Sequence, residues 1–335
     1  MSNQSAILPG GNLSRRLAMG LSAATMASAA HAQGARWPDR PVNMVVGFPP
    51  GGQTDFAARM LQAPLSVALG QTVPIDNRAG AGGNIATEQV LRARPDGYTL
   101  LAGNVGSFVL NPHTMPSMTF DPMDMTPIGL MLSSPLLLAV HASLPIRTFA
   151  EWREWVMRSQ PRGIDMGTSS AGGIVHATSE KLRGRLGNPE INLVHYRGSG
   201  PALQDFISNR FPTMFDAPSL LHPFIEAGQV RPIMVTSERR NSAFPNVPTA
   251  AESGLPNFIV SAWIGLFGPR GLPGDIVTRA NAALNEACRD TQARDRIAAR
   301  GDEIGGGTVE DFASMVRREH TEWGAIVRTA NIRAE

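Results

Sequence analysis

The segment that decides the fold is residues 42–55, VNMVVGFPPGGQTD. Val42–Val46 is short, apolar and mostly β-branched, which is typical of a buried strand. Gly47–Gly52 follows as a tight loop of glycine and proline. Thr54 and Asp55 then supply a polar start for an amphipathic helix. This segment therefore predicts a strand, a glycine loop and a helix in succession.

The same unit recurs along the chain. Further strands are predicted at Val73–Asp76, Tyr98–Ala102, Leu136–Val140, Asn192–Tyr196 and Phe211–Phe215, with a short one near Gly163–Asp165. Helices are predicted at Asn84–Arg94, Phe149–Met157, Ile174–Leu186 and Pro201–Ile207. Strands that alternate with helices predict an α/β fold whose parallel sheets carry helices on both faces.

The length of 335 residues predicts two lobes, because a single hydrophobic core stops growing at about 250–300 residues. The tail holds a strand-like run at 258–267 and two helical patterns, Gly274–Arg300 and Thr308–Thr329. We expect the tail to have no other strands and to pack on a sheet formed elsewhere. The predicted lobes are 36–134 with 262–335, and 135–261, so the first lobe is discontinuous.

The N-terminus has the pattern of a signal peptide, residues 1–32. Arg15 and Arg16 precede an uncharged run that ends in Ala30-His31-Ala32, a small-residue cleavage site. Residues 14–19 also match part of a twin-arginine pattern, but Ala18 stands where an aromatic is usual, so the export route stays open. The alternative is a disordered or helical tail on a cytoplasmic protein. The run contains no cysteine for a lipid anchor.

Composition narrows the function classes. The net charge is +2 and Lys181 is the only lysine, so no basic stripe points to nucleic acid. A single cysteine, Cys288, allows no internal disulfide. No H-E-x-x-H, C-x-x-C or G-K-[ST] motif occurs, so no metal or nucleotide cofactor is expected. No segment after the signal run is apolar for long enough to span a bilayer.

Three loops rich in glycine or serine each precede a predicted helix: Pro49–Asp55, Thr168–Gly173 and Gly198–Gly200. The first amides of a helix lack internal partners and lie at its positive end, so such loops favour anions. A single loop of this kind is more often only a tight turn. In an open sheet, however, these loops gather at the carboxyl ends of the strands, where ligands bind.

An enzyme interpretation is weaker. Residues 167–172, GTSSAG, nearly match a nucleophile elbow, but Ala171 stands where its final glycine is required. Ser169 or Ser170 paired with His176 would make a catalytic pair, although His176 is expected inside the following helix. Asp55 and Asp216 have two interpretations each, as helix caps or as contacts to a ligand ammonium, hydroxyl or water.

Several ordered motifs resemble the receptors of tripartite tricarboxylate transporters, also called Bug or TctC-like binding proteins. The matching stretches are WPDRP (37–41), PPGGQTD (49–55), NRAGAGG (77–83), PDGYTL (95–100), YRG (196–198) with PAL (201–203), MFD (214–216) and PNVPT (245–249). Two departures concern the distal pocket. His195 replaces the usual proline, and NRFP at 209–212 replaces a glycine-rich run.

The resemblance implies a two-lobed venus-flytrap fold of the periplasmic binding-protein type II kind. It also implies a ligand carboxylate held by the 49–55 and 169–172 loops, partly through water. The family's ligands include di- and tricarboxylates, acidic amino acids and aromatic acids, and its partner is a membrane permease.

We therefore expect a monomeric periplasmic receptor that is not an enzyme and needs no cofactor. The alternatives are a periplasmic serine hydrolase using Ser170 and His176, or a receptor for a signalling partner. The predicted ligand-binding residues are Phe48, Gly51, Gly52, Gln53, Thr54, Asp55, Asn104, Ser107, Ser169, Ser170, Ala171, Gly172, His176 and Asp216.

Overall fold

The structure is a computed structural model that describes residues 37–196 and 198–334. Residues 37–39 belong to a separate N-terminal unit, and residues 40–334 contain all the described helices and strands. The predicted signal peptide, residues 1–32, lies outside the described residues. No helix in the described ranges combines the length and apolar content that a membrane span requires.

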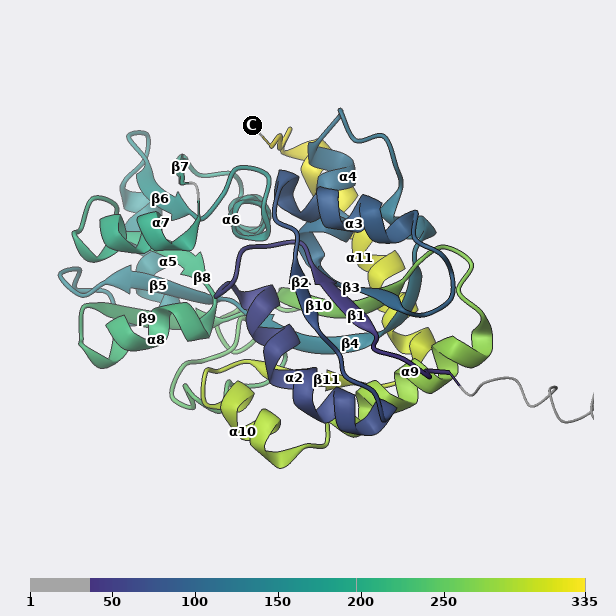
Figure 1. The fold of residues 1–335 in the computed structure, drawn as a ribbon. Coiled ribbons are helices and arrows are strands. Elements are labelled where there is room, and N and C mark those ends of the chain that lie inside the picture. Colours follow the sequence, from purple (N-terminus) through teal and green to yellow (C-terminus); the bar gives the residue numbers. More distant parts are fainter. Residues whose placement is uncertain (1–36, 197, 335) are drawn as a thin grey trace, which may run out of the picture. The chain divides into compact units, whose positions relative to one another are not determined.

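Two sheets organise residues 40–334 (Figure 1). The first has six strands in the order β11-β4-β10-β3-β1-β2. Their bounds are β1 Asn43–Val46, β2 Ile75–Asn77, β3 Thr99–Asn104, β4 Thr126–Pro135, β10 Ser261–Gly268 and β11 Glu303–Gly306. The second has five strands in the order β7-β6-β8-β5-β9. Their bounds are β5 Leu137–His141, β6 Ile164–Thr168, β7 Ile191–His195, β8 Thr213–Asp216 and β9 Val230–Val235.

Helices cover these sheets, and most of them follow a strand directly. They are α2 Gln53–Leu69, α3 Asn84–Leu91, α4 Asn111–Thr114, α5 Phe149–Arg158, α6 Ile174–Arg185, α7 Ser199–Ile207, α8 Pro218–Glu226, α9 Gly274–Ala287, α10 Thr291–Ala298 and α11 Val309–Thr329. Short 3₁₀ turns lie at Ala81–Gly83 and Pro122–Asp124, and a π-helical turn lies at Gly106–Leu110.

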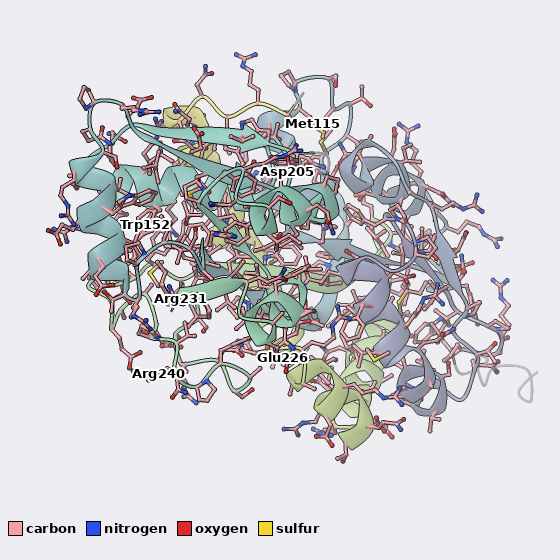
Figure 2. All side chains as sticks on the ribbon, turned by 90° about the vertical axis from the view of Figure 1, so that its left-hand side faces the viewer. Met115, Trp152, Asp205, Glu226, Arg231 and Arg240 are labelled. Carbon is pink, nitrogen blue, oxygen red and sulfur yellow. The ribbon has the colours of Figure 1, made fainter. Side chains whose placement is uncertain are left out.

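The core consists of the apolar faces of the strands and of the helices packed on them. Trp152 of α5, labelled in Figure 2, is fully buried in this core. Trp263 of β10 is 1% exposed and contacts Phe108, Phe267 and Phe312. The opening segment behaves as predicted: strand β1 is buried, and the glycine loop leads directly into α2.

Three expectations about these elements were wrong. The sheets are mixed rather than parallel, because β10 runs antiparallel to β3 and β4, and β5 runs antiparallel to β8 and β9. The tail contributes a strand of its own, β11, which was not predicted because its sequence, EIGG, is short and half glycine. The single helix expected at 274–300 is divided, since Asp290 caps a new helix by accepting from the Ala293 amide at 2.8 Å.

The chain passes between the two sheets at two places, once directly and once through a long segment. Strand β4 ends at Pro135 and β5 begins at Leu137, whereas the return runs from β9 through residues 236–260 to β10. The Thr236 hydroxyl ties these passages together, because it accepts from the Leu136 amide at 2.8 Å and donates to the Val260 carbonyl at 2.7 Å. Outgoing β4 and returning β10 must run in opposite directions, which explains the mixed sheet. The exact lobe limits stay a prediction.

Candidate functional site

A cavity of about 610 Å³ lies at the carboxyl ends of β1, β3, β6 and β7, where loops from both sheets meet. This is the edge at which open α/β sheets bind ligands. The described lining residues are Phe48, Pro49, Pro50, Gly52, Gln53, Thr54, Gly82, Asn104, Val105, Gly106, Asn111, Met115, Ser169, Ser170, Ala171, Gly172, Gly173, Ile174, Gly198, Ser199, Ala262, Trp263, Ile264 and Ala334. The three predicted loops therefore converge.

Three helices begin at this cavity, and each is led by glycine. The N-cap residues of α2, α6 and α7 are Gly52, Gly173 and Gly198, and none provides a side-chain cap. Away from the cavity, α5, α10 and α11 are capped by the side chains of Thr148, Asp290 and Thr308, whereas α8 and α9 also begin without a side-chain cap. The orphan amides at the cavity thus remain available for an external acceptor.

None of the described residues that line the cavity carries a charged side chain. Hydroxyl groups come from Thr54, Ser169, Ser170 and Ser199, and amide side chains come from Gln53, Asn104 and Asn111. A Cβ atom at Gly173 would collide with the Ser170 Oγ atom, so this hydroxyl lies directly at the start of α6. The polar groups therefore gather at the helix starts.

Apolar side chains form the rest of the wall: Phe48, Val105, Met115, Ile174, Ala262, Trp263 and Ile264. The Trp263 Nε1 atom donates to Glu319 Oε2 at 2.7 Å, so its hydrogen-bonding capacity is already used. A ligand in this cavity would thus meet polar groups at the helix starts and apolar surface elsewhere.

Nine of the fourteen predicted site residues line the cavity: Phe48, Gly52, Gln53, Thr54, Asn104, Ser169, Ser170, Ala171 and Gly172. The other five, Gly51, Asp55, Ser107, His176 and Asp216, are not part of the lining; Gly51 is exposed and the other four are buried. Each of these five makes a hydrogen bond within the shell that holds the cavity loops.

Asp55 supports the loop before α2 from beneath. It is 2% exposed and accepts from the Gly51 amide at 2.9 Å, from Arg59 Nε at 2.8 Å and from Asn77 Nδ2 at 2.9 Å. Burial by itself raises the pKa of Asp55, but these hydrogen bonds and the Arg59 charge outweigh it and lower the pKa. Asp55 is therefore ionised, with its charge balanced by Arg59, and it holds the loop before α2 rather than capping the helix. Asn77 holds the same loop, because it also donates to the Phe48 carbonyl at 3.0 Å.

His176 and Ser107 have similar positions behind the other loops. The Gly172 amide donates to His176 Nδ1 at 3.0 Å, and the Ser107 amide donates to Asn104 Oδ1 at 3.1 Å. Burial, the nearby His195 ring and Arg183 lower the pKa of His176 to about 4, so its imidazole is neutral at pH 7. Because Nδ1 accepts from a main-chain amide, it is not placed to take a proton from Ser170.

Asp216 lies behind α7. It is 3% exposed, accepts from the Ala217 amide at 2.8 Å and from the Ser199 side chain, and leaves its Oδ2 atom without a partner. Burial raises the pKa of Asp216 to about 6, against the opposing effect of these hydrogen bonds. The Ser199 side chain, which lines the cavity, thus lies next to this carboxylate.

Sequence reasoning missed the cavity residues that lie outside the predicted glycine loops. Met115 follows α4, Ala262–Ile264 lie within β10, and Ala334 follows α11. Their sequences carry no binding signal, because an apolar strand and a helix end look alike wherever they pack. Ser199 and Gly173 lie within the predicted loops Gly198–Gly200 and Thr168–Gly173 and could have been included.

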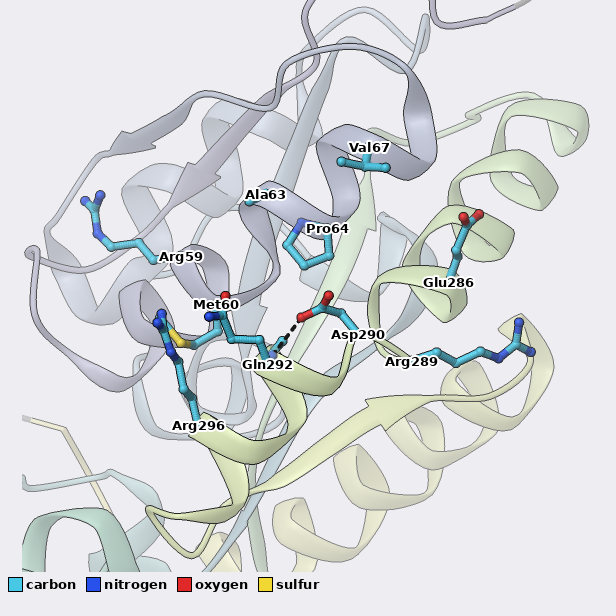
Figure 3. Close-up of a pocket in the computed structure, with 11 residues that line it drawn as sticks. Arg59, Met60, Ala63, Pro64, Val67, Glu286, Arg289, Asp290, Gln292 and Arg296 are labelled. Carbon is cyan, nitrogen blue, oxygen red and sulfur yellow. Dashed lines mark hydrogen bonds between the residues drawn. The ribbon is translucent and has the colours of Figure 1, made fainter.

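A second concavity of about 510 Å³ lies between α2, α9 and α10 (Figure 3). Its lining includes Arg59, Arg289 and Arg296 as well as the carboxylates Glu286 and Asp290. Arg59 already pairs with Asp55, and Asp290 caps α10. In the part of the chain that the structure describes, no group of three or more histidine, cysteine or carboxylate side chains is arranged to hold a metal.

Comparison with known proteins gives a consistent result. A family model described as "Tripartite tricarboxylate transporter family receptor" matches residues 57–332. The structure of the periplasmic binding protein BugD is similar, with 30% identity, 89% of this chain and all of that chain covered, and a TM-score of 0.75.

Two further solved structures contain carboxylates. MatC from Rhodopseudomonas palustris, with bound malate, is 32% identical, covers 87% of this chain and 100% of its own, and has a TM-score of 0.73. Another R. palustris protein, with adipate, is 35% identical, and the match covers 89% of this chain and 99% of that protein with a TM-score of 0.78. The predicted two-lobed binding-protein fold is confirmed.

Proposed function

Because the chain belongs to the tripartite tricarboxylate transporter receptor family, we propose that its cavity binds a small organic carboxylate for delivery to a membrane permease of that transporter type. Members of this family are solute-binding receptors rather than enzymes, so the hydrolase alternative is set aside. The malate and adipate in the two neighbours make these acids the first ligands to test.

One observation carries the proposal: three glycine-led helix starts, without side-chain caps, line one cavity whose described lining has no charged side chain. Each helix start contributes about 0.3–1 kcal/mol toward an anion, and about 2 at best. Micromolar affinity needs about 8 kcal/mol. The difference has to come from hydroxyl donors, bridging water and burial of the ligand's apolar part.

The roles of the individual residues follow from their positions. Thr54, Ser169 and Ser170 are proposed as direct donors, and Phe48, Gly52, Gln53, Asn104, Ala171 and Gly172 as further contacts. Gly51, Asp55, Ser107, His176 and Asp216 are proposed to position these contacts from behind.

Isothermal titration calorimetry with malate and adipate tests the function, with 1,6-hexanediol as the neutral analogue of adipate. We expect at least one acid to bind at micromolar concentration and the diol not to bind, because only the acids offer a negative oxygen pair to the helix starts. A folded protein that binds no member of a wider carboxylate panel would remove the proposal.

Variants test the donors. Thr54→Val removes the hydroxyl of a residue that is 5% exposed, with little change of shape. The loss of a hydrogen bond to a charged group predicts an affinity about 10- to 100-fold lower. Ser242→Ala, on an exposed loop, is the control and should bind like the parent protein. Equal affinities for both variants would exclude Thr54 as a donor.

Periplasmic location and delivery to the permease need cellular tests. Cell fractionation should find the protein with its native leader in the periplasm. Replacement of Arg15 and Arg16 by Gln should retain it in the cytoplasm if the leader uses the twin-arginine route. Uptake of the bound acid should require both this receptor and its permease, whereas a purely signalling receptor would leave uptake unchanged. Size-exclusion chromatography with light scattering checks the expected monomer.

A further inference from the structure

The short segment after α11 is fixed at two points. Asn331 ends the helix with φ of +50°, and Ile332 turns back into the core, 3% exposed, with its amide donating to the Val327 carbonyl at 2.9 Å. Two residues later, the Ala334 amide donates to the Thr114 carbonyl at 3.1 Å. The segment is therefore held against both α11 and α4.

Ala334 also lies in the cavity wall and touches the loop that follows β6. A Cβ atom at Gly172 would come within 2.9 Å of the Ala334 Cβ and 3.0 Å of its Cα. Gly172 has φ of +72°, a conformation that favours glycine, and its amide is held by His176. Ala334 therefore packs against the bare backbone of Gly172.

These contacts join parts that belong to different sheets. The α4 helix follows β3 of the six-stranded sheet, whereas Gly172 follows β6 of the five-stranded sheet. Ala334 contacts both, and Met115, directly after α4, lines the cavity beside it.

We propose that Ile332–Ala334 forms a strap that closes one side of the cavity, and that Ala334 sets the size of ligand the cavity accepts. Ala334 already packs closely on Gly172 and borders the cavity, so we expect a larger side chain at 334 to extend into the cavity or to displace the 169–173 loop. The size-selection part rests on the proposed carboxylate binding, whereas the strap contact does not.

Hydrogen–deuterium exchange on the ligand-free protein tests the strap by itself. Ala334→Pro removes the amide that donates to Thr114 and leaves the buried Ile332 in place. We expect the peptide covering residues 166–175 to exchange about 3- to 10-fold faster, because one anchoring hydrogen bond and its contact are lost. Arg333→Ala, which changes only an exposed side chain, is the matched control. Unchanged exchange in Ala334→Pro, or equal effects in both variants, would overturn the strap.

Calorimetry with malate and adipate then tests size selection. Ala334→Leu should weaken adipate, the longer acid, about 10-fold more than malate, because the added atoms occupy the cavity end that Ala334 borders. Equal affinity changes for the two acids would overturn the role of Ala334 in size selection. If the parent protein binds neither acid, other straight-chain acids from four to eight carbons serve as probes. Failure of all of them would refute the proposed function and with it the size selection, while the exchange result still decides the strap.

Discussion

The buried His176 should make the protein lose stability as the pH falls below 6.5. Burial, His195 and Arg183 lower its pKa in the folded chain to about 4, whereas the unfolded side chain has its ordinary value of 6.5. Between these values only the unfolded state binds the proton. The free energy of unfolding is therefore complete above pH 6.5 and falls progressively as the pH approaches 4.

The size of the loss in the free energy of unfolding follows from the pKa shift of His176. A difference from 6.5 to about 4 corresponds to at most about 3 kcal/mol, and solvent screening reduces the expected loss to about 1–2 kcal/mol. His176→Gln keeps an acceptor for the Gly172 amide but does not titrate, so it should remove this loss. His176→Leu leaves the amide unsatisfied and should cost about 1–3 kcal/mol at pH 7 as well.

Urea unfolding followed by tryptophan fluorescence, at half-unit steps from pH 4 to 7.5, measures the effect. Other groups also titrate in this range, so the decisive quantity is the difference between the parent profile and the His176→Gln profile. We expect this difference to change by about 1–2 kcal/mol across the range. Parallel profiles would refute the reasoning, because they would mean that His176 has the same pKa in both states.

Three further results are expected. Burial raises the pKa of Asp302 to about 6, so the stability that its protonated form contributes is complete below pH 3.8 and is lost as the pH rises through 6. In urea unfolding, the free energy of unfolding of Asp302→Asn relative to the parent should therefore be about 2 kcal/mol higher at pH 8 than at pH 4, and a difference that does not change with pH would contradict this. Burial also raises the pKa of Cys288 to about 12, so a thiol reagent at pH 8 should react quickly only in urea, and fast reaction of the native protein would show that the thiol is accessible. Gly265→Ala should cost about 1–3 kcal/mol in urea unfolding, since its Cβ would collide with the Phe312 ring, and an unchanged midpoint would mean that the ring can move.

Much of the fold could be predicted from local sequence. The run from Val42 to Asp55 combines a buried strand, a loop and a helix start, and each of these signals lies within a few residues. The strand expected at 258–267 is found at Ser261–Gly268. The direction of β10 could not be predicted in the same way, because it depends on where the chain returns after more than a hundred residues.

The cavity residues also divide into those that local sequence predicts and those that depend on long-range packing. Thr54 and Ser170 were found because glycine loops before helices carry a physical signal for anion binding. Trp263 and Ala334 were missed because their place in the wall results from long-range packing. The positions of Asp55 and His176 behind the wall could not be predicted either, since a residue in the first turn of a helix can face either the loop or the ligand.

The glycine-led helix starts have a consequence for how such a receptor can diverge. A substitution can delete a hydroxyl or an imidazole, but apart from proline it cannot delete a main-chain N–H. The main-chain amides that are proposed to bind the anion are thus protected from most point mutations, whereas the side chains of Met115, Ile174 and Ala334 in the cavity wall can be replaced. If the cavity binds a carboxylate as proposed, a lineage can exchange one acid for another without first losing the main-chain groups that hold the carboxylate.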